Sequence, residues 1–547
     1  MLIAAWSNFI GANRRITPRR LADGLGADAY NMRLGSMDLR PWNAPATVVT
    51  TGGATPLISA YRMDRATISD TASWLQWSVD VDVVRSLIPN DTTEEIYYSG
   101  DGAPKLTDNE LALPAIPGPA AWRTLGVPKP TTQMAAPTVL VAGTGANETR
   151  VYVDTFVNTK NRESAPGIPR AFTCLAGSTA NLTGLGAAPG GAHDINRRRI
   201  YCSTDGGDYL LVVEQLSGPD TATDSLARVA VLQSGGDPSK PAWEEPPADT
   251  FGLISLWNGM IGGIVAPKTY GVCEPGKPWA WPVEYQESVS DNIVATGKWL
   301  QNWLILTTAN PYLVTGSSPL SLSNQPIPFN QACVSKRSVV SLGHGVCWAS
   351  PDGLCYVGQG GQQVLTEGLL SPEQWQALNP AGMIGSRVER YYVGFYNDGT
   401  AKGFLIDPLN PAGGLIFLTF GARGAYYDPI STRLYMQDTG NTIKRWGAGS
   451  ALTATFKTPI RRHLYLTNPG YAMVVADEPA SVVVKLWANV LQPGGALNWT
   501  LVFNRTITSG EPFALPGGYL SQEFQAQIGT ASPVQGLLLA EDAEDLA

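Results

Sequence analysis

The sequence predicts an all-β protein: a β-propeller interrupted by an immunoglobulin- or fibronectin-like sandwich module, with a C-terminal β domain. A weak repeat recurs roughly every 35 to 45 residues from about Phe251 to Gly447, a spacing typical of propeller blades. Glycine and proline are abundant, with 58 and 41 residues, whereas charged residues make up only 15%. Few windows keep the i, i+3, i+4, i+7 apolar spacing of a helix, so a mostly helical fold is disfavoured.

Each repeat consists of an apolar strand, a short turn and a second strand that ends in an aromatic residue. In the first repeat the turn is Asn258-Gly259, and Asn-Gly between two apolar runs is a strong hairpin signal. A single unit cannot bury its faces alone, so neighbouring units are expected to pack side by side. Another large antiparallel β fold is the alternative at this point. The repeats cover residues 252–260, 298–316, 338–357, 390–399 and 425–440.

The sequence pattern changes along the chain. Residues 1–45 lack the blade pattern and are expected to form an N-terminal arm, and residues 46–127 are expected to form the first part of the propeller. Residues 128–245 are typical of a small sandwich, and blade-like sequence on both sides indicates an insertion into a propeller loop. The main blades are expected at 246–450. Residues 451–547 are expected to form the C-terminal β domain with an acidic tail.

Charge and hydropathy argue against two classes of protein. The net charge of -8 and the pI near 5.1 disfavour a protein that grips nucleic acid, because neutralising phosphates requires clustered Lys and Arg. No apolar stretch reaches the roughly 18 residues that would predict a membrane-spanning segment, and the first residues lack the pattern of a secretory signal. We interpret the short basic runs as solvated faces or subunit contacts: Arg14-Arg15, Arg19-Arg20, Arg197-Arg198-Arg199 and Arg461-Arg462.

The cysteines indicate a reducing compartment. There are six of them in this long chain, with no CxxC pair and no spacing typical of a disulfide framework. We therefore expect free thiols in the core and folding in a reducing cytosol.

No catalytic, cofactor-binding or metal-binding residue is predicted, and the chain is not expected to be an enzyme. A Ser-His-Asp hydrolase needs a base beside an exposed nucleophile, and none of His193, His344 and His463 lies in a nucleophile-elbow sequence. His344 with Cys347 and Cys355 does not have the spacing of a common zinc site. A carboxylate pair for glycoside hydrolysis stays open, since the separation of such a pair depends on the fold.

Three weaker signals have structural explanations. Residues 203–209 resemble the Asp-box turn of sialidase-like propellers, in which a carboxylate accepts backbone hydrogen bonds within a hairpin. The glycine-rich segments 143–145 and 358–361 lack the strand, loop and helix that a phosphate site requires. Trp279 and Trp281 could form a face that stacks on sugars, although aromatic residues that close blade hairpins are the commoner use.

The order of residues along the chain resembles that of the tail tubular B or nozzle proteins of short-tailed bacteriophages, and of related phage virion proteins. At the N-terminus the resemblance lies in Gly11-Ala12-Asn13, Pro18-Arg19, Leu21, Asp23, Ala29, Asn31, Leu34 and Leu39-Arg40-Pro41. Further similarity lies in residues 148–152 with 163–166, 273–275 with Pro278, Trp281 and Pro282, and 311–316. These positions span most of the chain, but none of them is a catalytic signature.

The resemblance implies a structural virion protein. Proteins of this family form a hexameric ring at the far end of the tail tube, with a propeller in each subunit and a central channel through which the genome leaves. The implied partners are other copies of the chain, a tail tube or adaptor protein, and tail fibres or spikes. The implied location is the phage tail, after synthesis in the host cytoplasm. Genomic DNA would pass without specific binding, since an acidic wall repels phosphates.

Two other functions remain open from the sequence. The chain could be a receptor-binding or glycan-degrading tail protein, or a free carbohydrate-binding propeller with no virion. Clustered carboxylates with Arg and Tyr at the blade tops would indicate an enzyme. The sequence alone does not identify such a cluster.

Overall fold

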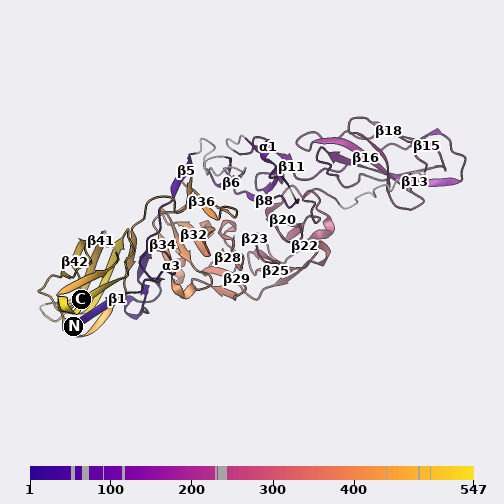
Figure 1. The fold of residues 1–547 in the computed structure, drawn as a ribbon. Coiled ribbons are helices and arrows are strands. Elements are labelled where there is room, and N and C mark those ends of the chain that lie inside the picture. The colour runs from indigo at the N-terminus through magenta and orange to yellow at the C-terminus, as the bar shows by residue number, and fades with distance from the viewer. Residues whose placement is uncertain are drawn as a thin grey trace.

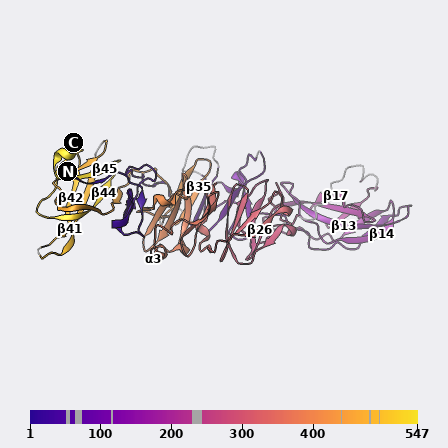
Figure 2. The ribbon, with the colours of Figure 1, turned by 90° about the horizontal axis from the view of Figure 1, so that it is seen from below.

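The computed structural model describes residues 1–547 except 51–55, 64–72, 90, 114–117, 228–230, 232–242, 439, 478–480, 493 and 547. Three β-rich parts lie in a row along an elongated molecule (Figure 1). A C-terminal domain holds both chain ends, a propeller occupies the middle, and a sandwich module forms the opposite end; Figure 2 shows the same order from below. This architecture confirms the predicted all-β fold.

Seven antiparallel sheets of the described residues form the propeller ring, and the one that contains β31 continues into a larger, ten-stranded sheet. Neighbouring sheets contact each other through their first strands, in the order β8 (Asp82–Arg85), β19 (Phe251–Ser255), β23 (Ile293–Trp299), β27 (Val340–Ser341), β31 (Ile384–Val388), β35 (Gly424–Asp428) and β6 (Ser59–Arg62). A core cluster that includes Tyr61 and Tyr98 then joins β6 back to the sheet of β8. Five sheets are meanders of four consecutive strands: β8 (Asp82–Arg85), β9 (Ile96–Ser99), β10 (Lys105–Thr107) and β11 (Arg123–Thr124); β19 (Phe251–Ser255), β20 (Ile261–Ala266), β21 (Thr269–Val272) and β22 (Gln286–Ser288); β23 (Ile293–Trp299), β24 (Asn302–Thr307), β25 (Tyr312–Thr315) and β26 (Ser323–Pro326); β27 (Val340–Ser341), β28 (Gly345–Ala349), β29 (Leu354–Gly358) and β30 (Gly361–Val364); and β31 (Ile384–Val388), β32 (Tyr391–Asn397), β33 (Ala401–Ile406) and β34 (Ile416–Leu418).

The other two sheets bring early parts of the chain into the ring. One consists of β35 (Gly424–Asp428), β36 (Arg433–Gln437) and β37 (Thr442–Arg445), and its outermost strand is β5 (Ala46–Thr50), which pairs antiparallel with β37. The other is the two-stranded sheet of β6 (Ser59–Arg62) and β7 (Trp74–Trp77). Residues from before and after the sandwich therefore share one ring.

The sandwich lies between β11 and β19 in the chain. One sheet has the order β12 (Thr138–Val141), β15 (Thr179–Thr183) and β18 (Thr221–Asp224). The other has the order β14 (Arg170–Leu175), β13 (Asn147–Asn158), β16 (Ile195–Thr204) and β17 (Leu210–Leu216). Tyr152, Leu182 and Ile200 pack between the two sheets and are fully buried.

Buried charges hold the sandwich against the propeller. Glu95, just before β9, accepts a hydrogen bond from Tyr97 and pairs with Arg162 and with Lys160, whose Nζ lies 2.6 Å from its Oε2. Lys160 also lies 2.7 Å from Asp108. Because the Glu95 and Arg162 side chains are almost fully buried, this cluster fixes the joint where the two parts meet.

The N-terminal residues are not the separate arm that the sequence predicted. β1 (Leu2–Trp6) pairs antiparallel with β45 (Gly536–Ala540) in the C-terminal domain, where Ala4 and Trp6 are buried. β4 (Asp28–Tyr30) lies between β34 of the propeller and β38 (Ala454–Lys457) in one ten-stranded sheet. The apolar side chains of these strands join the largest core, and the sheet continues without a break from a blade into the C-terminal domain.

The rest of the C-terminal domain is also β-structure. It contains β39 (Arg461–Thr467), β40 (Tyr471–Val475), β41 (Val482–Leu491), β42 (Leu497–Ile507), β43 (Phe513–Ala514) and β44 (Ser521–Thr530), and β2 (Gly11–Ala12) pairs with β3 (Leu25–Gly26) nearby in the chain. In the described residues the α-helices are α1 (Asn109–Ala112) and α3 (Pro372–Gln376), and the 3-10 turns are η1 (Pro18–Arg20), η2 (Val283–Tyr285), η3 (Pro319–Ser321), η4 (Lys336–Ser338), η5 (Pro380–Gly382), η6 (Pro411–Gly413) and η7 (Ala543–Leu546). In the part of the chain that the structure describes, no helix has the length and apolar character needed to cross a bilayer.

Candidate functional site

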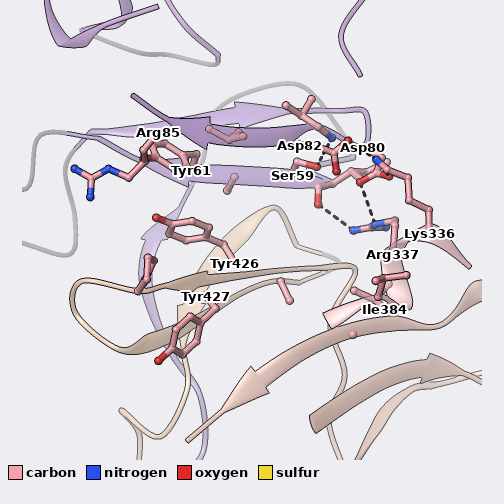
Figure 3. Close-up of a pocket in the computed structure, with 18 residues that line it drawn as sticks. Ser59, Tyr61, Asp80, Asp82, Arg85, Lys336, Arg337, Ile384, Tyr426 and Tyr427 are labelled. Atoms are coloured by element: carbon pink, nitrogen blue, oxygen red, sulfur yellow. Dashed lines mark hydrogen bonds and ion pairs between the residues drawn. The ribbon is translucent and has the colours of Figure 1, made fainter. Parts of the chain in front are cut away.

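A cavity of about 430 Å³ opens between inner strands of the propeller, and Figure 3 shows the residues that line it. Its walls come from the first strands of several sheets, β6, β8, β31 and β35, and from the η4 turn before β27. These strands lie at the inner ends of the blades, so the cavity lies on the axis of the ring. We call it the axial pocket, and its volume is in the range of small-molecule sites.

A compact ion cluster forms one end of the axial pocket. The ammonium nitrogen of Lys336 lies 2.8 Å from Asp80 Oδ2 and 2.7 Å from Asp82 Oδ2. Asp82 also accepts a hydrogen bond of 3.0 Å from the backbone amide of Gly252 on β19. The cluster therefore links the start of β8, the strand β19 and the η4 turn that precedes β27.

Arg337 extends this cluster along the wall. Its Nη2 donates to the carbonyl of Ile58 at 3.1 Å and to that of Arg423 at 2.8 Å, and its Nε lies 3.7 Å from Asp80. The carbonyl groups precede β6 and β35, so one guanidinium group connects two further blades. A Cβ atom at Gly424 would lie 2.1 Å from the Ile58 carbonyl oxygen, which explains why glycine occupies this crossing.

Burial and charge act in opposite directions on these groups. Burial raises the pKa of Asp82, and the neighbouring Lys336 ammonium opposes this shift. About a quarter of the Asp82 side chain remains exposed. Burial alone would lower the pKa of Lys336, but Asp82 and Asp80 together raise it above its ordinary value. Lys336 therefore stays charged between the two carboxyl groups.

Tyrosines form the other side of the pocket. Tyr61 on β6 and Tyr426 on β35 contact each other edge to face, with ring centroids 5.4 Å apart. Tyr427 also lines the cavity, and the Arg387 guanidinium lies 3.9 Å from the centre of its ring. The pocket thus combines carboxylates, basic groups and aromatic rings, a combination that the sequence alone did not identify.

The residues considered as sequence candidates lie elsewhere. His193 precedes β16 of the sandwich, His344 lies in the turn before β28 with Nδ1 3.0 Å from the Tyr356 hydroxyl, and His463 lies in β39 of the C-terminal domain. Cys347 and Cys355 are buried on β28 and β29. Among the described residues, no three His, Cys, Asp or Glu side chains gather as a metal site requires.

Two other sequence signals have structural roles here. In the turn resembling an Asp-box, Asp205 Oδ1 accepts a hydrogen bond of 2.8 Å from the backbone amide of Thr149, between strands of the sandwich. Trp281 is fully buried and donates to the Pro278 carbonyl at 2.9 Å. Trp279 contacts Trp243 edge to face and lies beside Arg162. The two tryptophans therefore do not form one open stacking face.

No family model and no curated protein matches this chain. Solved structures with partial similarity include AztD from Citrobacter koseri (10% identity, TM-score 0.26, 70% of this chain and 98% of that one) and BamB from Moraxella catarrhalis (12%, 0.24, 58% and 99%). Another is the extracellular domain of a putative one-component system from B. thetaiotaomicron (9%, 0.28, 91% and 59%). TM-scores this low do not establish a common fold, so the propeller assignment depends on this chain's own strand pairing.

Proposed function

We propose that this chain is a structural subunit of a bacteriophage tail. In this proposal several copies, six by analogy with the resembling family, form a ring-shaped nozzle at the end of the tail tube. The ring conducts DNA during ejection, binds a tail tube or adaptor protein, and anchors fibres or spikes. The sequence resemblance suggests the role, and one structural observation supports assembly most directly: large apolar side chains stand exposed at both ends of the molecule.

The first exposed surface is an irregular segment of β39 in the C-terminal domain. β39 pairs with β44 at Arg461, Arg462 and Thr467, and the register shifts between Arg462 and Thr467. The residues between them project outward, with Leu464 83% and Tyr465 70% exposed. Covering two neighbouring large side chains would remove apolar area from water, which supports the proposal that a partner docks here.

Further exposed leucines lie close to this segment. Gln522 on β44 donates to the Leu464 carbonyl at 3.2 Å, and the neighbouring Leu520 accepts a hydrogen bond of 3.0 Å from the Leu491 amide. Leu491 pairs in turn with Leu497 across the β41–β42 hairpin. We call this set the C-terminal apolar surface: Leu464, Tyr465, Leu466, Leu491, Leu497 and Leu520, all of them exposed.

The second exposed surface is the strand β12 in the sandwich. β12 is the edge strand of its sheet, and Val139, Leu140 and Val141 are all exposed. An apolar edge strand is open to pairing with another chain, and natural proteins usually cover such an edge. Two unlike adhesive surfaces on one chain suit heterologous contacts, which close into rings when the rotation between copies allows it.

The acidic character of the chain suits passage of DNA. Each copy carries a net charge of -8. We therefore expect a channel wall shared by several copies to repel phosphates rather than bind them. A ring wall lined mainly by Lys and Arg would remove this argument.

The proposal is tested on the purified full-length chain. Negative-stain electron microscopy and sedimentation velocity are expected to reveal a closed ring of several copies, and labelled antibodies against the chain should mark the tail tip of the corresponding phage particles. A monomer at micromolar concentration, together with particles whose tail tips stay unlabelled, would contradict the proposal.

A further inference from the structure

We infer that the axial pocket is a binding site for an uncharged sugar residue. This inference does not depend on assembly of several copies, because the strands and the turn that line the pocket belong to one propeller. Three properties carry it: the balance of charges on the wall, the hydrogen-bonding groups that the ion cluster presents, and the tyrosines opposite that cluster.

The charges of the pocket wall favour an uncharged ligand. Asp80 and Asp82 oppose Lys336 and Arg337, two negative groups against two positive ones. The fifth charged group, Arg85, extends away from this cluster and lies 3.6 Å from Glu94 (Figure 3). An anion in the pocket would approach two carboxylates and a cation would approach two basic groups, so neither gains net attraction.

The same groups are well suited to hydroxyl ligands. An ionised carboxylate accepts hydrogen bonds at about four positions, and an ammonium group donates three. Lys336 directs two of its donors to Asp80 and Asp82, which leaves acceptor positions on both carboxylates for a ligand. A sugar hydroxyl donates and accepts at the same time, and can therefore meet both kinds of group without bringing a charge.

The opposite wall is suited to the C–H faces of a sugar ring. Tyr61, Tyr426 and Tyr427 line this side together with Ile384 and Val339. Tyrosine offers an apolar ring and a polar hydroxyl, which is the combination that an amphipathic ring ligand requires. With about 430 Å³, the cavity has the size of a small-ligand site.

The wall is rigid, so a ligand would enter a pocket that already exists. A Cβ atom at Gly385 would lie 2.5 Å from the Ser338 carbonyl oxygen, and the approach at Gly424 is closer still, 2.1 Å. The Val81 amide donates to Ser59 at 3.0 Å, which fixes the segment that carries Asp80 and Asp82. A preformed site loses little ordering entropy on binding.

The test uses saturation-transfer difference NMR on the purified full-length chain. The probes are the methyl glycosides of glucose, galactose, mannose and N-acetylglucosamine, with inorganic phosphate and acetate as competing anions. We expect at least one glycoside to bind with a Kd in the millimolar range, about 1 mM, and neither anion to displace it. Binding of none of the glycosides, or displacement by phosphate or acetate, would overturn the inference.

Variants locate the binding. Asp80→Asn keeps the shape of the side chain and removes its charge, and Tyr427→Ala removes a partly exposed ring, so the second variant remains informative if the first fails to fold. Each is expected to weaken glycoside binding at least about tenfold. The matched control Tyr465→Ser, at the C-terminal apolar surface, should bind like wild type. Unchanged binding in folded Asp80→Asn and Tyr427→Ala would place the sugar elsewhere and refute the assignment. A variant that only fails to assemble into a multi-copy ring should still bind the glycoside.

Discussion

Replacing both Leu464 and Tyr465 with serine is expected to weaken assembly strongly. Full burial of a large apolar side chain contributes roughly 1.5–3 kcal/mol. Because Leu464 is 83% and Tyr465 70% exposed in the single chain, a partner that covers both gains about 3 kcal/mol at each contact. Each 1.4 kcal/mol corresponds to a factor of ten, so the double variant should weaken each contact about 100-fold.

Sedimentation velocity over a range of concentrations measures this effect directly. The wild-type chain should sediment as a ring, and the double variant should sediment as a monomer at concentrations about 100-fold higher than those at which wild type dissociates. The two side chains project from an irregular part of β39, so the fold should persist, and circular dichroism checks this.

Leu409→Ser provides the matched control. Leu409 is also an exposed leucine, but it lies between β33 and β34 of the propeller, away from both apolar surfaces. The control should assemble like wild type. Assembly of the double variant at wild-type concentrations, or equal loss of assembly in Leu409→Ser, would refute the role of the C-terminal apolar surface.

Three further results are expected. Glu95→Gln leaves Arg162 without its buried carboxylate and should lower the free energy of unfolding by about 3 kcal/mol in denaturant unfolding. The control Glu244→Gln removes one partner of an exposed pair and should cost less than about 1 kcal/mol. Equal effects of the two variants would contradict the role of the joint. Burial raises the pKa of Asp154 to about 6, above its unfolded value, so the stabilisation from binding this proton is present at low pH and lost as pH rises through about 6. Relative to Asp154→Asn, wild type should lose about 1 kcal/mol of protection in hydrogen exchange of β13 between pH 5 and pH 7, and parallel pH profiles would argue against it. Burial raises the pKa of every cysteine thiol, so a disulfide reagent followed by mass spectrometry should label none in the native chain within minutes and all six after denaturation; fast native labelling would disprove this.

Local sequence signals predicted the blades because hairpins are local structures. Asn258 and Gly259 both have positive φ, 53° and 75°, as the tight turn between β19 and β20 requires. Alternating apolar residues around such turns then specify which face of each strand is buried. The all-β fold with a propeller followed from these signals, repeated along the chain.

Pairing between distant segments left no comparable signal. β5 completes a blade whose other strands begin near residue 424, and β1 pairs with β45 at the opposite end of the sequence. Nothing in the five residues of β1 specifies the partner, since an apolar strand can pair with any open edge. The N-terminal segment was therefore predicted as a separate arm, whereas it forms strands within the C-terminal domain.

The axial pocket was invisible for the same reason. Lys336 and Asp80 are 256 residues apart, and only closure of the ring brings them within 2.8 Å. The pair Asp80 and Asp82 could have drawn attention as two carboxylates at the start of a strand. Without the position of Lys336, however, they could not be distinguished from solvated loop residues.

The axial pocket also constrains how the proposed nozzle would conduct DNA. The ion cluster of Asp80, Asp82, Lys336 and Arg337 spans the inner ends of several blades, and the cavity beside it has the size of a small-molecule site. A duplex therefore cannot pass along the axis of a single propeller. Any conduit in the proposed assembly must lie between copies, with a wall made from the outer surfaces of neighbouring chains. In this proposal DNA passage depends on assembly, because a variant that sediments as a monomer has no channel for a genome.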